Sequence, residues 1–153
     1  MNISKAVWGN SVWLLFHTLA EKLKDEHASE LPILFSHIAT ICNNLPCPDC
    51  QSHAMTIINR TNKAAVSASK ENLIDFLWNF HNSVNARLTK PIVTKESLAK
   101  YQLANTDKIV KHFIFVMKNV KNNNNSLMHG FHRNLYINKF SEYIYANAYK
   151  YNP

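Results

Sequence analysis

The chain has 153 residues, a formal net charge of +7, three cysteines and only two glycines, Gly9 and Gly130. Two glycines are too few for a P-loop or a glycine-rich dinucleotide fingerprint, so any bound nucleotide would have to be held by side chains. No run of about 18 apolar residues occurs, and we expect no membrane span. No secretory signal is visible, and three cysteines do not make a secreted disulfide scaffold. We therefore expect a cytoplasmic protein.

The positive charge is concentrated in the last third of the chain. Residues 1–103 carry ten Lys and Arg against eight Asp and Glu, a net charge of +2, whereas residues 104–153 carry seven against two, a net charge of +5. A basic chain can bind nucleic acid, but no nucleic-acid-reading motif accompanies the charge, and we do not expect such binding. We divide the chain into a domain over residues 1–103 and a basic, helical C-terminal extension over residues 104–153.

Apolar residues recur with the helical period along most of the chain, whereas alternating β-branched runs are short. We therefore predict an all-α fold, a small antiparallel helix bundle followed by the helical extension. The predicted helices cover residues 6–23, 30–43, 47–62, 71–88 and 95–102 in the bundle, and residues 107–120 and 135–149 in the extension. Residues 63–70 are predicted to be a polar linker, and residues 122–125 are predicted to break the helices of the extension.

The stretch LPCPDCQSHA, residues 45–54, contains the only closely spaced cysteines, Cys47 and Cys50. Two thiols at the start of a helix can form and reopen a disulfide, and the positive end of the helix dipole favours a thiolate there. In a cytoplasmic protein such a pair is more often catalytic or metal-binding than structural. Because His53 follows, a zinc-binding interaction module that uses Cys47, Cys50 and His53 is the alternative to a redox dithiol. Cys42 is interpreted as a buried thiol.

Two of the predicted helices carry a second face that is rich in aromatic, histidine and amide side chains. On the first helix this face consists of Gly9, Trp13 and His17, and on the helix over residues 71–88 it consists of Trp78, His81, Asn82 and Asn85. Tryptophan offers a stacking plane, and histidine and asparagine offer hydrogen bonds suited to a nucleobase or ribose. Lys90, just past the helix, could meet a phosphate. Core packing explains each of these residues alone; the combination with the dithiol indicates a site.

Three stretches resemble the FAD-linked sulfhydryl oxidases of the Erv/ALR type, above all the small versions encoded by large cytoplasmic DNA viruses. These stretches are WGNSVWLLFHT over residues 8–18, LPCPDCQSHA over residues 45–54 and HNSVNARLTK over residues 81–90. They occur in order, within about residues 7–101. The resemblance implies a four-helix bundle with a short fifth helix that holds FAD non-covalently and forms a homodimer.

The resemblance also implies roles for individual residues. Cys50 would be the sulfur next to the flavin, and Cys47 would be the outer sulfur that exchanges disulfides with substrate. The implied cofactor-binding residues are Gly9, Trp13, His17, Cys50, His53, His81, Asn82, Val84, Asn85, Leu88 and Lys90. The implied activity is a thiol oxidase that passes electrons through FAD to molecular oxygen and yields hydrogen peroxide. A viral cytoplasmic pathway of disulfide formation, in the host cytoplasm or the virion, is the expected setting.

The chain departs from the family pattern in several places. Asn10 stands where the family often has arginine. The additional structural cysteine pair and the C-terminal tryptophan of cellular members are absent, and so is a second dithiol that would shuttle electrons from substrate. We therefore expect a small thioredoxin-like or Cys-paired protein as the electron donor. Residues 104–153 match no family pattern, and three roles remain open for them: packing on the bundle, dimerisation or docking of a partner.

Overall fold

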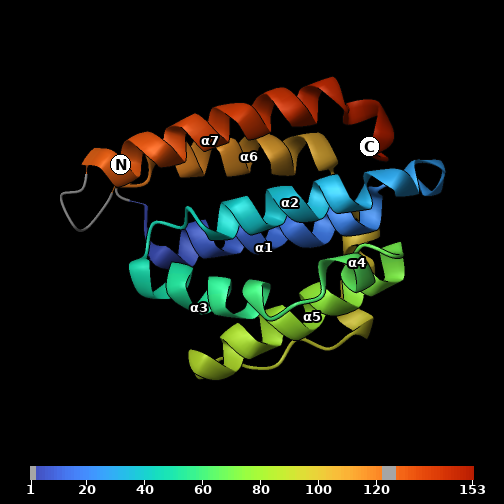
Figure 1. The fold of residues 1–153 in the computed structure, drawn as a ribbon, viewed down its shortest axis with the longest axis horizontal. Helices are drawn as coiled ribbons and strands as arrows, with labels where there is room; N and C mark the ends of the chain where they lie inside the picture. Colours follow the sequence, from blue (N-terminus) through green and yellow to red (C-terminus); the bar gives the residue numbers. More distant parts are fainter. Residues whose placement is uncertain (1–2, 122–126) are drawn as a thin grey trace.

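Helices run through nearly all of the computed structural model, which describes residues 3–121 and 127–153 (Figure 1). The α-helices are α1 Lys5–Lys22, α2 Leu31–Cys42, α3 Pro48–Asn59, the short α4 Lys63–Val66, α5 Lys70–Arg87, α6 Thr106–Asn119 and α7 Leu127–Ala146. Three 3₁₀ helices accompany them: η1 Asp25–Glu30, η2 Glu96–Leu103 and η3 Ala148–Lys150. Within the described residues the only β-type pairing is an isolated bridge between Leu23 and Tyr151. The prediction of an all-α fold is confirmed.

Five of the α-helices begin at a side chain that accepts a hydrogen bond from a backbone N–H of the first turn. Ser4 accepts from Val7 at the start of α1, and Ser69 accepts from Asn72 at the start of α5. At α3 the cap is a sulfur: Cys47 Sγ accepts from the N–H of Cys50 at 3.2 Å. Such caps satisfy backbone donors that the helix leaves unpaired, so they set where each helix begins.

The helices form three layers (Figure 1). The middle layer consists of α1 and α2, which are covered on one side by α3 and α5 and on the other side by α6 and α7. One continuous apolar core joins the layers, and its fully buried aromatic rings include Phe16 of α1, Phe113 of α6 and Phe140 of α7. Of the three roles left open for residues 104–153, the structure therefore shows packing on the bundle.

The end of the chain is attached to the end of α1. The N–H of Lys24 donates to the carbonyl of Lys150 at 2.9 Å, and the N–H of Asn152 donates to the carbonyl of Lys22 at 2.7 Å. Lys150 also forms a 2.7 Å ion pair with the buried carboxylate of Glu30. No helix in the described part of the chain is long and apolar enough to cross a membrane.

Two predictions about the elements are wrong. The linker predicted over residues 63–70 contains the helical turn α4, because the side chain of Asn62 caps it by accepting from the N–H of Ala65. Helix α7 begins at Leu127 instead of residue 135. Its early turns are held by the buried Arg133, whose guanidinium donates to the carbonyl of Val120 just past the end of α6. The predicted break at residues 122–125 lies outside the described residues.

Candidate cofactor cavity and dithiol

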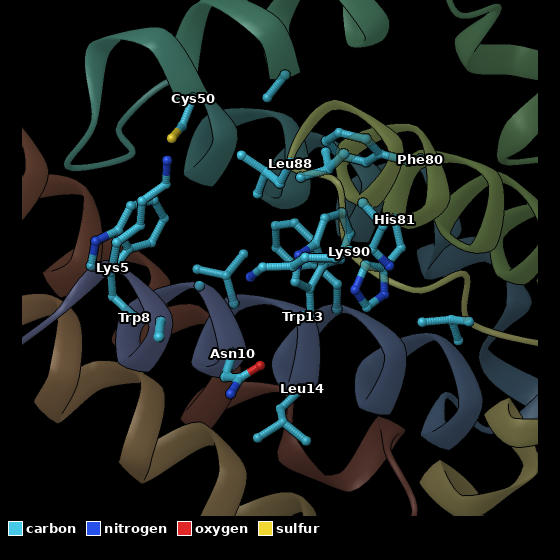
Figure 2. Close-up of a pocket in the computed structure, with 18 of the residues that line it drawn as sticks. Lys5, Trp8, Asn10, Trp13, Leu14, Cys50, Phe80, His81, Leu88 and Lys90 are labelled. Carbon is cyan, nitrogen blue, oxygen red and sulfur yellow. The ribbon is translucent and has the colours of Figure 1, made fainter.

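A cavity of about 500 Å³ lies between α1, the start of α3, the C-terminal half of α5 and η2 (Figure 2). This volume is within the range of small-molecule and cofactor sites. Much of the wall is apolar and comes from side chains of the core, including Trp8, Val12, Phe16, Leu45 and Phe80. Polar side chains, among them several cations, complete the wall, and such a mixture of apolar and polar groups is usual for a ligand site.

Two stacked pairs of rings, joined by a hydrogen bond, lie at one side of the cavity. Trp13 lies on His81 with ring centroids 4.1 Å apart and planes 7° apart, and His17 lies on Tyr101 at 4.9 Å and 22°. His17 Nε2 and His81 Nδ1 are 2.9 Å apart and share one hydrogen bond. Trp13 and His81 are near the centre of the view in Figure 2. This side of the cavity therefore presents flat aromatic surface.

Both histidines are held in the neutral form. Burial is the largest cause that lowers the pKa of His17 to about 3, followed by the charges of His81 and Lys100. Burial likewise lowers the pKa of His81 to about 4, followed by the charges of Lys100 and Lys90. Since the hydrogen bond between the rings needs one donor and one acceptor nitrogen, it requires at least one neutral ring. The pair therefore keeps its hydrogen bond at neutral pH.

The charged groups that line the cavity are all cations. They are Lys5 of α1, Arg87 at the end of α5, Lys90 just after it and Lys100 of η2. No Asp or Glu is among the described residues of the lining. A ligand with negative charge would meet attraction here without repulsion.

Asn85 places an unpaired amide in the cavity wall. The residue is 6% exposed, and its side chain forms no hydrogen bond with any of the described residues, although its backbone carbonyl accepts from the N–H of Lys90 at 2.8 Å. The amide reaches the open cavity, so its donor and acceptor are available to a ligand. Between these two residues Thr89 adopts a left-handed conformation with φ of 57°, which turns the chain at the cavity edge.

Two residues of the predicted second face of α5 hold the following loop. The side-chain amide of Asn82 donates to the carbonyl of Val93 at 2.9 Å and accepts from the N–H of Val93 at 2.8 Å. Trp78 Nε1 donates to the same carbonyl at 2.8 Å. Val93 lines the cavity, whereas Asn82 and Trp78 do not. Asn82 and Trp78 therefore hold Val93, and with it one edge of the cavity, in place.

The dithiol lies where α3 begins, and its two sulfurs differ in position. Cys50 lines the cavity and Cys47 does not, and both thiols are free. Burial is the largest cause that raises the pKa of the Cys50 thiol, and the hydrogen bond with Cys47 raises it further. The nearby ammonium group of Lys5 acts on this pKa in the opposite direction. The net shift is upward, contrary to the thiolate that the helix dipole alone led us to expect.

The third cysteine, Cys42, is buried as predicted. Its side chain contacts the cavity from α2, but the residue is only 1% exposed. Burial raises the pKa of the Cys42 thiol to about 12, so the thiol stays protonated at neutral pH and is a poor nucleophile.

The structure brings most of the predicted cofactor-binding residues to this one cavity. Those in its wall are Gly9, Trp13, Cys50, His53, His81, Val84, Asn85, Leu88 and Lys90. His17 lies behind the wall and supports His81, and Asn82 lies behind Val93. At Gly9 an added Cβ would meet no atom within 4 Å, so the wall is open there. Cofactor binding by these residues remains a prediction.

Among the wall residues that sequence reasoning did not identify are three cations, Lys5, Arg87 and Lys100, and the aromatic Tyr101. Lys5 and Lys100 are among many lysines of the chain and have no distinctive spacing. Tyr101 lies on η2, and η2 reaches the cavity only because it packs against α1. Arg87 is part of the HNSVNARLTK stretch and could have been found there.

Comparison with known proteins identifies relatives that share this region. A sequence profile of the Erv1/Alr family matches residues 10–106. A protein of Invertebrate iridescent virus 3, by name an FAD-linked sulfhydryl oxidase, is 35% identical over 105 residues, which cover 67% of this chain and 71% of that protein. A protein of Invertebrate iridescent virus 6 with the same descriptive name is 33% identical over 108 residues, 65% of this chain and 94% of that protein. A similarly named protein of Fowlpox virus is 30% identical over 71 residues, 46% of this chain and 69% of that protein. No solved structure matches the chain at a significant level.

Proposed function

The chain belongs to the Erv1/Alr family, and on that premise we propose that it is an FAD-dependent thiol oxidase that forms disulfides in substrate proteins. Its dithiol is Cys47 and Cys50. The observation that carries the proposal is the position of this pair: Cys50 faces a cavity with aromatic and cationic walls, while Cys47 lies outside the lining. One sulfur can thus meet a cofactor and the other a substrate.

The cavity fits FAD in three respects. The stacked rings of Trp13 and His81 provide a flat surface for an aromatic ring system. The cations of the wall complement a pyrophosphate, and no carboxylate opposes them among the described lining residues. The unpaired amide of Asn85 offers both a donor and an acceptor to a base or ribose. Lys90 and Arg87 are the side chains that we expect to hold the phosphates.

The chain's own residues carry out the exchange of disulfides. In the oxidised protein a substrate thiolate attacks Cys47 Sγ, which forms a mixed disulfide at Cys47 and releases Cys50 as a thiolate. A second substrate thiolate then attacks the substrate sulfur of the mixed disulfide, which releases Cys47 and leaves the substrate oxidised. The substrate loses two electrons and two protons, and the protein gains two thiols.

Bound FAD supplies the acceptor that takes two electrons from the Cys47–Cys50 pair and passes them to oxygen. Overall, two thiols and one oxygen molecule become one disulfide and one hydrogen peroxide molecule. Since the described residues contain no second pair of nearby cysteines, the electrons come from a separate dithiol protein, small and thioredoxin-like or Cys-paired. We place the reaction in the host cytoplasm or the virion, and we propose a homodimer as the assembled form.

Oxygen consumption and flavin content test the proposed function. The purified full-length protein should show visible flavin absorption and should consume oxygen with dithiothreitol as the thiol donor. Cys50→Ala should bind flavin but consume no oxygen, and Cys47→Ala should likewise be inactive. Cys42→Ala is the matched control, because its thiol is buried and protonated, and it should remain active. A colourless protein that gains no flavin when FAD is added would refute the proposal.

The zinc-binding alternative lacks geometric support. Among residues 3–121 and 127–153, no three His, Cys, Asp or Glu side chains are clustered closely enough to hold a metal ion. Cys47, Cys50 and His53 therefore do not form the three-ligand set that a zinc module requires. Stoichiometric zinc in a flavin-free preparation would reverse this conclusion.

A further inference from the structure

The side chain of Lys5 reaches across the cavity edge to Cys50, with its ammonium nitrogen directed at the sulfur (Figure 2). Lys5 is the first residue of α1, and Cys50 lies in the first turn of α3. Tertiary packing alone brings them together. We propose that Lys5 is the electrostatic partner of the reacting Cys50 sulfur: its ammonium group stabilises the Cys50 thiolate and holds it toward the cavity. This inference rests on the proposed thiol oxidase function.

No structural requirement accounts for a lysine at this position. The first turn of a helix carries the positive end of the helix dipole, where a cation is unfavourable and an acidic residue is preferred. The first turn of α1 nevertheless contains no acidic residue and begins with Lys5. The residue is exposed, and it forms no ion pair with any carboxylate in the described part of the chain. The approach of its ammonium group to the Cys50 sulfur is thus what distinguishes its surroundings (Figure 2).

The four cations of the cavity act on different titratable groups: one acts on Cys50, and the other three act on histidines. Burial and the neighbouring Cys47 both raise the pKa of the Cys50 thiol, and Lys5 is the cation, among the described residues, that lowers it. Arg87 acts on His53, and Lys90 and Lys100 act on His81. The cations on α5 and η2 therefore do not take the place of Lys5.

Stabilising the thiolate has a direct chemical consequence. The thiolate of Cys50, and not its thiol, is the nucleophile and the leaving group of the dithiol reactions. On deprotonation the S–H bond breaks and the proton passes to water, while the lysine keeps its own proton and its charge. Lys5 thus offsets part of the cost that burial imposes on the reactive form of Cys50, without taking part in any bond that is made or broken.

The test measures the reactivity of Cys50 against pH in the full-length chain. All variants carry Cys47→Ser, so that iodoacetamide labelling of the peptide containing Cys50, quantified by mass spectrometry, reports on Cys50 alone. Lys5→Gln should move the midpoint of the labelling rate upward by about half to one pH unit and slow labelling at neutral pH about three- to tenfold. Lys5→Arg should retain the wild-type profile. Lys108→Gln removes a lysine from the first turn of α6, away from the cavity, and is the matched control that should change nothing.

A Lys5→Gln profile that coincides with the Lys108→Gln profile would overturn the inference. A second measurement does not depend on any substitution of the lysine. Because Lys5 is exposed, added salt should screen its charge and slow the labelling of Cys50 when Lys5 is present, and salt that leaves this rate unchanged would also count against the proposal. Flavin content and oxygen consumption of the wild type are measured separately. A flavin-free, inactive wild type would refute the proposed function, whereas unchanged labelling profiles with an active wild type would refute the role of Lys5 alone.

Discussion

Replacing Gly9 by alanine should make the flavin-free protein more stable and weaken its binding of FAD. Gly9 is in the interior of α1, where glycine costs about 0.5–1 kcal/mol relative to alanine, and the added Cβ would meet no atom within 4 Å. For a chain of this size the gain corresponds to a rise in Tm of about 1–4 °C. Because Gly9 lines the cavity, the same methyl group takes space from a ring that approaches the helix backbone. We expect FAD affinity to fall at least about tenfold, or about 1.4 kcal/mol.

Urea denaturation of the flavin-free protein and titration with FAD, followed by flavin fluorescence, measure the two effects separately. A Gly9→Ala variant that is more stable and binds FAD as tightly as the wild type would show that the cofactor does not approach α1 at this residue. A less stable flavin-free variant would contradict the open space at Gly9. The control is Gly130→Ala in α7, outside the cavity lining, which should leave FAD affinity unchanged.

Three further substitutions or conditions test other parts of the structure. Thr89→Gly should raise the free energy of unfolding by about 1 kcal/mol in urea denaturation, because a threonine with φ of 57° is strained and glycine is not. Arg133→Met should lower it by about 2–4 kcal/mol, since the buried guanidinium donates to the carbonyls of Met117 and Val120 at the end of α6. The folded pKa of His17, about 3, is below the ordinary 6.5, so the unfolded chain takes up the proton first as pH falls. The stability present above pH 6.5 should therefore decrease by up to about 2 kcal/mol between pH 7 and pH 5, and His17→Gln should remove this part of the pH dependence.

The helices that were predicted well are those whose apolar residues follow the helical period. In α1 the periodic apolar residues, such as Leu15 and Leu19, are fully buried, and so is Phe113 of α6. The early turns of α7 contain Gly130 and mostly polar residues, so their sequence carries no such pattern. They are stabilised by the tertiary contact of Arg133 with α6, which single-sequence periodicity cannot detect.

In the candidate site, too, contacts within one helix were predictable and contacts between helices were not. Spacing within one helix was enough to place Trp13 on the cavity face of α1, and the C-x-x-C spacing was enough to identify the dithiol. The partner of Cys50 was not predictable, because Lys5 reaches it from another helix. The sequence analysis also gave the wrong direction for the shift in the pKa of the Cys50 thiol. The helix dipole is visible in the sequence, whereas burial, the larger effect here, depends on the elements that pack around the sulfur.

The extension has a consequence for the cavity, although no residue of α6 or α7 lines it. Helix α1 carries Lys5, Gly9 and Trp13 on the cavity side, and it packs against α6 and η2 as well as α5. Since α1 lies in the middle layer, its position depends on apolar contacts from both outer layers, and the core does not divide where the family match ends at residue 106. A protein interior transmits strain because it is closely packed. The geometry between Lys5 and Cys50 is therefore supported from two sides: by α3, which carries the sulfur, and by the extension, which fixes the helix that carries the charge.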